Sequence, residues 1–337
     1  MCATKAGFAP FWRREMGPSH DKRTPMIPDR YDYLPMPTRP PLKLPNGERV
    51  ALWVSPNVEF YEYLPPENKY RDPWPRTPHP DIMNYAHRDY GNRRGVWRCF
   101  DLLDKYKIRG TVSLNVAVFD HYPEIARAMV ERGWDYMSHA IYNTRFNFGM
   151  TEDEERAQIQ DVLETVKRHT GRIVSGWLGP ALTTTLNTPD LLAEADIKYW
   201  VDYFHDDQPF PVKVRSGRLI SVPYSIEIND AGVINAQGHT AETFGRMIRD
   251  QFDQLYAEGR DSARVMCIAL HPFLMHAPSR QKYLDEALSY IFSHGGVWNT
   301  TAGEIADWYY EEYYDAIVAA GERGRVLDPS LQGSGGL

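Results

Sequence analysis

The sequence predicts an α/β fold, and within that class a barrel of repeated strand–helix units. From Arg49 to about Tyr314, short apolar runs alternate with amphipathic helical segments, a pattern typical of parallel strands that are buried on both faces. The strand-then-helix order favours a (β/α) barrel over a doubly wound sheet, although periodicity alone does not separate the two. No GxGxxG or Walker loop stands at a strand end, so a nucleotide-binding sheet lacks its main support.

Eight segments are predicted strands, because each is a short apolar run bounded by turn residues. In chain order they are Val50–Ser55, Gly110–Asn115, Asp135–Ser138, Gly176–Leu178, Tyr199–Asp202, Ile220–Pro223, Val265–His271 and Val297–Asn299.

The helices between these strands carry start and stop signals. Thr151 with Glu154, and Thr301 with Glu304, form capping-box patterns ahead of apolar runs. Thr188 before Pro189 reads as an N-cap followed by proline at the first helical position. A helix that begins near Thr240 is expected to stop at Gly259.

The chain divides into three predicted parts. Residues 1–48 are rich in proline and lack a sustained period, so they are expected to form an extended arm that packs on a neighbour. Residues 49–320 form the barrel, and residues 321–337 form a flexible tail. The arm suggests a homo-oligomer.

Composition excludes several classes of partner. A net charge of −7 without clusters of Lys and Arg argues against a nucleic-acid surface. No apolar run approaches membrane-spanning length, so a soluble protein is expected. Three cysteines far apart in sequence fit a reducing compartment, which predicts a cytoplasmic location. An aromatic content of 13% suits a pocket for flat groups or an oligomer interface, although rings that fill the core explain it as well.

Polar residues that follow the strands are the first candidates for chemistry, because parallel barrels place their active sites at the carboxyl ends of their strands. His271 stands between the apolar run VMCIAL and Pro272, which puts its imidazole at the mouth of a strand. His139 follows WDYMS in the same way, although a lone histidine is more often structural. Glu59 follows the first strand, where a solvated loop carboxylate is an equally good reading.

Several blocks resemble one known family. The segments YGNRRGVWRCFDLLDKYKIRGTVSLN, WDYMSHAIYNT, GWLGP, SVPYSIEIND and LHPFLMHAPSRQKYLDEAL together resemble the polysaccharide deacetylase (NodB-homology) superfamily, and more narrowly its branch of allantoinases and cyclic imide hydrolases. The resemblance covers about residues 49–312. It implies a distorted (β/α)7 barrel that hydrolyses a C–N bond.

The resemblance also implies roles for particular residues. Metal-dependent members carry an aspartate pair after the first strand, a His-x-x-x-His pair after a later strand and a histidine that acts as general acid. Asn57 and Glu59 stand nearest the aspartate pair, and His139 matches the first histidine of the pair. Asn143 replaces the second histidine, and His271 matches the general acid. Further residues expected to bind substrate are Arg94, Asn143, Trp177 and Asp207, together with Asn57.

These departures from the family pattern affect the expected cofactor. A catalytic zinc site normally uses three protein ligands from His, Cys and carboxylate. Glu59 and His139 would supply two ligands of these kinds, and Asn143 would supply only a neutral amide oxygen as the third. A weak divalent site, with zinc one possibility, and a metal-free site therefore both stay open. Without a metal, Glu59 would activate water, and apolar walls are expected to raise its pKa.

The expected activity is hydrolysis of a small amide, imide or ureide, most naturally a cyclic one, with His139 or a metal stabilising the oxyanion and His271 protonating the departing nitrogen. One alternative is a metal-dependent carbohydrate de-N-acetylase. Another is an inactive barrel that only binds a ligand, which the missing second histidine suggests and the retained His271 opposes.

Overall fold

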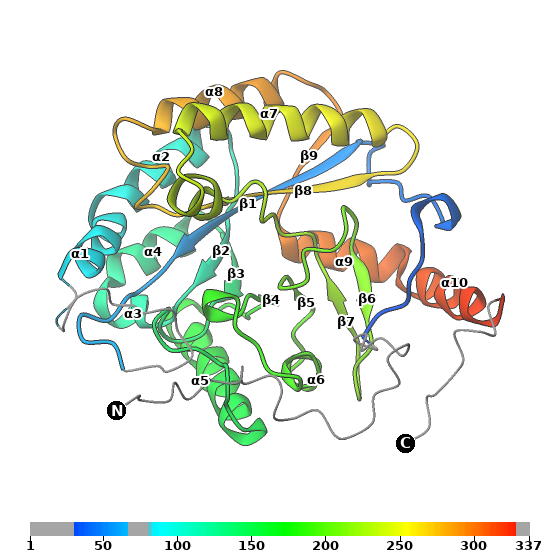
Figure 1. Ribbon diagram of the computed structural model, residues 1–337, viewed down its shortest axis with the longest axis horizontal. Coiled ribbons are helices and arrows are strands. Elements are labelled where there is room, and N and C mark those ends of the chain that lie inside the picture. The colour runs from blue at the N-terminus through cyan, green and yellow to red at the C-terminus, as the bar shows by residue number, and fades with distance from the viewer. Residues whose placement is uncertain (1–29, 67–79, 81, 328–337) are drawn as a thin grey trace, which may run out of the picture.

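A curled sheet of mostly parallel strands forms the centre of this computed structural model, which describes residues 30–66, 80 and 82–327 (Figure 1). Neighbouring strands follow the order β6-β7-β5-β4-β3-β2-β1-β8, and β9 pairs with β1 beside that path. All pairs are parallel except β6 with β7. The strands are β1 (Val50–Val58), β2 (Thr111–Leu114), β3 (Asp135–Ser138), β4 (Gly176–Trp177), β5 (Tyr199–Trp200), β6 (Phe210–Val212), β7 (Leu219–Ser221), β8 (Arg264–Leu270) and β9 (Val297–Asn299).

Helices surround this sheet, so the predicted α/β barrel architecture is confirmed (Figure 1). The α-helices are α1 (Ile82–Tyr90), α2 (Val96–Lys105), α3 (Ala117–His121), α4 (Pro123–Glu131), α5 (Glu152–Thr170), α6 (Thr188–Glu194), α7 (Ala241–Glu258), α8 (Gln281–Phe292), α9 (Ala302–Glu312) and α10 (Tyr314–Leu327). Short 3-10 helices lie at Met36–Thr38 and Pro180–Leu182, and π-helices lie at Gly91–Gly95 and Ala231–Ala236. None of the helices in these described residues is long and apolar enough to cross a membrane.

Every predicted strand is present, and the hairpin partner β6 was missed. The capping box at Thr151 forms as predicted, and Thr301 accepts a hydrogen bond from the Glu304 amide. The N-cap of α6 is Asn187 rather than Thr188, because the Thr188 hydroxyl accepts the N–H of Thr185 instead.

Gly259 ends α7 as predicted, but for a different reason. Its φ of −63° is an ordinary helical value, so no left-handed turn requires glycine there. A Cβ atom at this position would lie 2.4 Å from the carbonyl oxygen of Arg49. Gly259 is therefore needed for the close approach of the α7–β8 turn to the start of β1.

Alternation along the strands divides the core into two clusters. In β1, Leu52 and Val54 face a cluster shared with the outer helices, whereas Ala51 and Trp53 face a second cluster on the other side of the sheet. Because Trp53 pairs with Cys267 in parallel register, the neighbouring strand β8 divides its side chains in the same way.

The sheet is not closed by strand pairing, because β6 and β8 end its path among the described strands. Irregular segments meet the outer side of β8 instead. The N–H groups of Ala263, Val265 and Ala269 donate to the carbonyl oxygens of Leu42 (2.9 Å), Asp207 (2.9 Å) and Ile228 (3.0 Å).

The gap in strand pairing between β6 and β8 is called the seam below. The described part of the arm, residues 30–48, lies on the chain's own barrel at this seam. The Arg39 guanidinium binds both carboxylate oxygens of Asp206 (2.8 and 2.5 Å), and Arg30 binds Asp190 (2.8 and 2.7 Å). The side chains of Leu34, Leu42 and Leu44 are buried in the second cluster. The predicted boundary between barrel and tail falls inside α10, and residues 328–337 lie outside the described residues.

Replacing Leu42 with alanine tests how much this contact stabilises the fold. Leu42 is 3% exposed, and its loss is expected to lower the free energy of unfolding by about 2–4 kcal/mol, because it leaves a cavity beneath the arm. Leu186→Ala is the control, since that side chain is 89% exposed and should change stability by less than about 0.5 kcal/mol. Equal midpoints of urea unfolding for the two variants would contradict the arm's role.

Candidate active site

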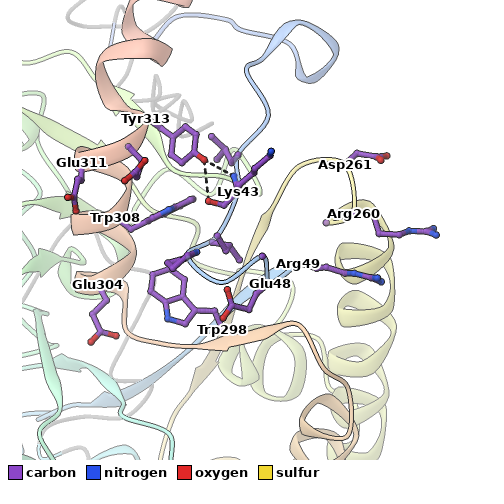
Figure 2. Close-up of a pocket in the computed structure, with 16 residues that line it drawn as sticks. Lys43, Glu48, Arg49, Arg260, Asp261, Trp298, Glu304, Trp308, Glu311 and Tyr313 are labelled. Carbon is purple, nitrogen blue, oxygen red and sulfur yellow. Dashed lines mark hydrogen bonds between the residues drawn. The ribbon is translucent and has the colours of Figure 1, made fainter.

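A hollow of about 1000 Å³ lies at the amino-terminal ends of the strands (Figure 2). Its walls come from the arm, the α7–β8 turn, β9 and α9, with Trp298 and Trp308 on one side. Arg49 at its edge precedes β1, which is about 30 Å long at about 3.3 Å per residue, so the hollow is far from the carboxyl end of that strand. In parallel barrels this amino-terminal face supports stability, and the chemistry lies at the opposite end.

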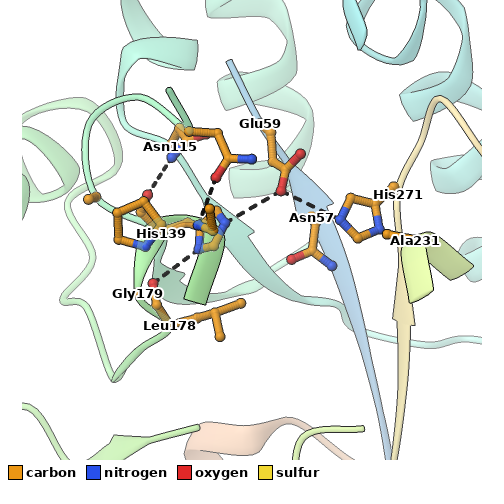
Figure 3. A network of polar contacts seen from close by, with 12 residues as sticks. Asn57, Glu59, Asn115, His139, Leu178, Gly179, Ala231 and His271 are labelled. Atoms are coloured by element: carbon orange, nitrogen blue, oxygen red, sulfur yellow. Dashed lines mark hydrogen bonds and ion pairs between the residues drawn. The ribbon is translucent and has the colours of Figure 1, made fainter. Parts of the chain in front are cut away.

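Three predicted catalytic residues meet at that opposite end (Figure 3). Glu59, His139 and His271 each stand one residue beyond β1, β3 and β8. Oε1 of Glu59 lies 3.4 Å from Nε2 of His139 and 3.5 Å from Nε2 of His271. All three residues are buried. Both imidazoles thus converge on one carboxylate oxygen.

His271 is held in place by Asp230, a residue that sequence reasoning missed. Its Nδ1 lies 2.7 Å from Oδ1 of Asp230. The same carboxylate accepts the backbone N–H groups of His271 (3.0 and 2.9 Å) and Met275 (3.2 Å). Because a carboxylate surrounded by donors accepts hydrogen bonds, Nδ1 carries a proton and Nε2 faces Glu59. Asp230 ends the block SVPYSIEIND, which the family resemblance included without assigning it a role.

His139 is oriented by backbone atoms. Its Nδ1 lies 3.0 Å from the carbonyl oxygen of Leu178, which can only accept, so Nδ1 carries a proton here too. Its own carbonyl oxygen accepts a hydrogen bond from Nδ2 of Asn115, and Oδ1 of Asn115 accepts the N–H of Phe60 (3.0 Å). Asn115 therefore ties the ends of β1, β2 and β3 together around the cluster.

The electrostatics of the cluster make Glu59 and His271 an ion pair. Burial alone would raise the pKa of Glu59, but the charge of His271 and the hydrogen bonds from both histidines outweigh it, so the pKa lies well below its usual range. Burial alone would lower the pKa of His271, but Glu59 and then Asp230 raise it to about 10. The expectation that apolar walls raise the pKa of Glu59 is therefore wrong, because two imidazoles face its carboxylate.

A further carboxyl group, Asp202, lies near His139. The N–H of Gly179 donates to both of its oxygens (3.0 and 3.2 Å). Burial raises the pKa of Asp202 to about 7, and the hydrogen bond from the N–H of Gly179 partly opposes this rise.

The two predicted asparagines lie beside the cluster, but their amide groups already bind protein atoms. Nδ2 of Asn57 donates to the hydroxyl of Tyr224 (3.1 Å) and to the carbonyl oxygen of Leu270 (3.2 Å), so it joins β1 to β8 just before the catalytic residues. Oδ1 of Asn143 accepts the N–H of Ala181 (3.2 Å), and Nδ2 donates to the hydroxyl of Tyr61 (2.5 Å).

The other predicted substrate-binding residues do not join the cluster. Trp177 is fully buried in the core. Arg94 is exposed on the π-helix before α2. The backbone carbonyl oxygen of Asp207 accepts the N–H of Val265. Val265 precedes His271 by six residues, a separation of roughly 20 Å along β8 at about 3.3 Å per residue.

The predicted metal ligands do not fit a metal site. Asn143 was expected to be the third ligand beside Glu59 and His139, but its amide oxygen accepts the Ala181 N–H. Across the described ranges, no three His, Cys, Asp or Glu side chains are arranged to hold a metal ion.

Tyr61 and Arg88 form a wall of the site that the sequence did not reveal. The Arg88 guanidinium carbon lies 4.8 Å from the ring centroid of Tyr61 and 5.1 Å from that of Phe273. The ring of Phe273 in turn lies edge-on to His271, with centroids 5.7 Å apart. Helix α1, which carries Arg88, thus covers the cluster beside His271.

Comparison of the sequence with known proteins finds similarity to one family and to two named deacetylases. The family described as "Polysaccharide deacetylase" matches residues 79–200. A Schizosaccharomyces pombe (strain 972) protein whose name groups it with the polysaccharide deacetylases is 28% identical over 265 residues, which are 72% of this chain and 82% of that protein. The peptidoglycan deacetylase of Helicobacter pylori (strain 26695) is 24% identical over 245 residues, which are 63% of this chain and 83% of that protein.

A solved structure confirms the predicted fold type. The crystal structure of PuuE allantoinase superposes with a TM-score of 0.72 and 25% sequence identity, over 82% of this chain and 95% of that one. The likeness therefore covers most of this chain.

Proposed function

We propose that this chain, which belongs to the polysaccharide deacetylase superfamily, hydrolyses a C–N bond in a small cyclic amide, imide or ureide. The superfamily consists of hydrolases that act on C–N bonds. The observation that carries the proposal is the pair of imidazoles that share one buried carboxylate oxygen, with one of them backed by Asp230.

This arrangement supplies a base and an acid at the same point. Glu59 is ionised and takes a proton from the attacking water. The His271 imidazolium gives its Nε2 proton to the departing nitrogen. Glu59 then releases this proton to water and Nε2 of His271 takes one up, which restores both groups for the next cycle. Asp230 keeps the imidazole in the required tautomer throughout.

His139 has a positioning role in this scheme. Its Nδ1–H is bound to the Leu178 carbonyl, and its Nε2 faces the same Glu59 oxygen, so it holds that carboxylate in one orientation. The second oxygen of Glu59, Oε2, is then left to meet water.

A cyclic substrate is favoured by the allantoinase likeness and by Asn143. The allantoinase superposes over 82% of this chain. Asn143 stands where metal-dependent deacetylases carry a second histidine, and its amide is bound to Tyr61 and Ala181. Both features point to an acid–base hydrolase of small amides.

A panel of cyclic imides, hydantoins and ureides tests the proposal. The full chain should hydrolyse at least one of them, with product followed by ring opening in the ultraviolet and by mass spectrometry. Parallel assays after dialysis against a chelator, and after addition of Zn²⁺, report whether a metal takes part. Absence of turnover across the panel in every metal condition would reject this substrate class.

The second candidate is a carbohydrate de-N-acetylase, which the names of the two deacetylase relatives favour. Release of acetate from chitooligosaccharides or peptidoglycan fragments, without hydrolysis of the cyclic amides, would select it. Two further expectations stay predictions: a cytoplasmic location, and a homo-oligomer, which light scattering would test.

A further inference from the structure

We propose that Asp202 is a positioning residue for the hydrolysis, which fixes the imidazole of His139 through the single peptide group that joins Leu178 to Gly179. This inference rests on the proposed function, because His139 holds the base Glu59 in that scheme. Asp230 contacts its histidine directly, whereas Nδ1 of His139 is held by a backbone carbonyl. Asp202 is the side chain that holds that part of the backbone.

The peptide group between Leu178 and Gly179 is bound at both ends. Its carbonyl oxygen, which belongs to Leu178, lies 3.0 Å from Nδ1 of His139 (Figure 3). Its N–H, which belongs to Gly179, donates to both carboxylate oxygens of Asp202, at 3.0 and 3.2 Å. A trans peptide is planar, and its C=O and N–H point in opposite directions. An acceptor that fixes the N–H therefore also fixes the direction of the carbonyl.

This peptide group lies where strand β4 stops pairing with its neighbours. The N–H of Leu178 donates to the carbonyl oxygen of Ser138 in β3 (2.9 Å). On the other side, the N–H of Val201 donates to the carbonyl oxygen of Trp177 in β4 (3.1 Å). At the next peptide group the partners are two side chains in place of backbone groups of β3 and β5. The sheet thus brings the peptide group to this place, and Asp202 sets its final orientation.

Gly179, in the block GWLGP, leaves the space that this contact needs. Its φ of −62° is an ordinary value, so the backbone conformation does not require glycine. A Cβ atom at this position would lie 2.8 Å from Oδ2 of Asp202 and 2.4 Å from the carbonyl oxygen of Thr183. A larger residue would therefore displace the carboxylate from the N–H that it accepts.

The contact reaches the base through the imidazole. Nε2 of His139 lies 3.4 Å from Oε1 of Glu59, so a rotation of the ring would move this nitrogen away from the carboxylate. An aspartate thus stands behind each of the two histidines on Glu59, directly at His271 and through one peptide group at His139. Asp202 does not touch the substrate in this scheme, so its loss should lower kcat rather than raise KM.

Proton NMR of the full chain with isotope-labelled histidine tests the contact without any substrate. In the wild type, Nδ1–H of His139 should give a signal that is protected from exchange with water and is absent from His139→Gln. Asp202→Ala should lose this signal to exchange, because the Leu178 carbonyl is no longer fixed. Asp202→Asn should keep it, because the amide oxygen of asparagine still accepts the N–H of Gly179.

Steady-state kinetics test the effect on catalysis. For whichever cyclic amide the wild type hydrolyses, Asp202→Ala should lower kcat by about 10- to 100-fold with little change in KM, because a misplacement of about 1 Å in a site can cost about 10²-fold. Asp202→Asn should restore most of this loss. If the alanine variant fails to fold, Asp202→Leu takes its place with the same expectations, because leucine fills the space without an acceptor.

Asp135→Ala is the matched control. The Asp135 carboxylate also accepts the N–H of a glycine, Gly303, at 3.0 Å, and lies at the opposite end of β3. It precedes His139 by four residues, roughly 13 Å at about 3.3 Å per residue. The control should keep both the His139 signal and the wild-type kcat.

The outcomes separate this inference from the proposed function. A wild type that hydrolyses no amide rejects the proposed function, and the NMR comparison then decides the contact by itself. A wild type without the protected signal, or an Asp202→Ala variant that keeps the signal or the wild-type kcat, overturns the role of Asp202. Equal losses in Asp202→Asn and Asp202→Ala would also overturn it.

Discussion

Glu59→Gln is expected to lower kcat/KM by about 10²- to 10⁴-fold, the range that a positioned general base contributes. Glutamine keeps the shape of the side chain, but its amide cannot take a proton from water. The comparison is made on the cyclic amide that the wild type hydrolyses, with steady-state kinetics on both proteins. Glu62→Gln is the matched control, because Glu62 lies in the same segment and binds Thr144 and Arg145 instead of the histidines.

The same variant should change the titration of His271. Glu59 is the first of the groups that raise the pKa of His271 to about 10, so its neutralisation should move that pKa down toward the ordinary value of a histidine. Proton NMR of the imidazole ring measures the shift directly. Activity within tenfold of wild type, or an unchanged His271 titration, would contradict the assignment of Glu59 as base and ion-pair partner.

Asp230→Asn should have an effect of similar size, about 10²- to 10⁴-fold on kcat/KM, although Asp230 does not contact the substrate in this scheme. Asparagine removes the negative charge that favours protonated His271. His271 acts as an acid, so it is competent below its pKa, and wild-type kcat/KM should fall as pH rises through about 10. In the variant this alkaline decline should begin at lower pH.

The free energy of unfolding should also decrease as pH rises, in the same direction as the activity. Because the folded-state pKa of His271 is raised to about 10, its stabilising contribution is complete below about pH 6.5 and is lost as pH rises toward 10. Asp230→Asn should flatten this part of the stability profile. The control is Asp135→Asn, a buried aspartate at the start of β3 that binds Ser175 and the N–H of Gly303. Equal pH profiles for Asp230→Asn and the wild type would contradict the coupling.

The strands and three members of the site could be predicted from sequence for one physical reason. A parallel strand buried on both faces is a short apolar run, and the first polar residue after it stands at the carboxyl edge of the sheet. Glu59, His139 and His271 all occupy that position. Strand β6 was missed because it is a three-residue antiparallel segment with Pro211 in its middle, which does not read as a strand.

The remaining site residues depend on contacts that local sequence does not contain. Asp230 opens a π-helix, 41 residues before the histidine it holds. To predict the direction of the Glu59 pKa shift, one must know that two imidazoles contact one of its oxygens. Burial between apolar walls, which was the expectation from sequence, predicts a shift in the opposite direction. Asp207 was predicted to bind substrate because it follows a strand. Its backbone carbonyl oxygen instead accepts the N–H of Val265 near the start of β8, away from the catalytic cluster.

The closure of the seam by the arm bears on how the protein can be handled. An unpaired strand edge is a template on which a second molecule can add its own strand, and that is a route to aggregation. Here the arm reaches the start of β8 through Leu42, and its proline-rich stretch has few N–H groups with which to recruit another strand. Pro35, Pro37, Pro40, Pro41 and Pro45 lie in that stretch. A fragment that lacks residues 30–48 but keeps the barrel would expose this edge, so we expect the arm to protect the protein against aggregation as well as to contribute to the core.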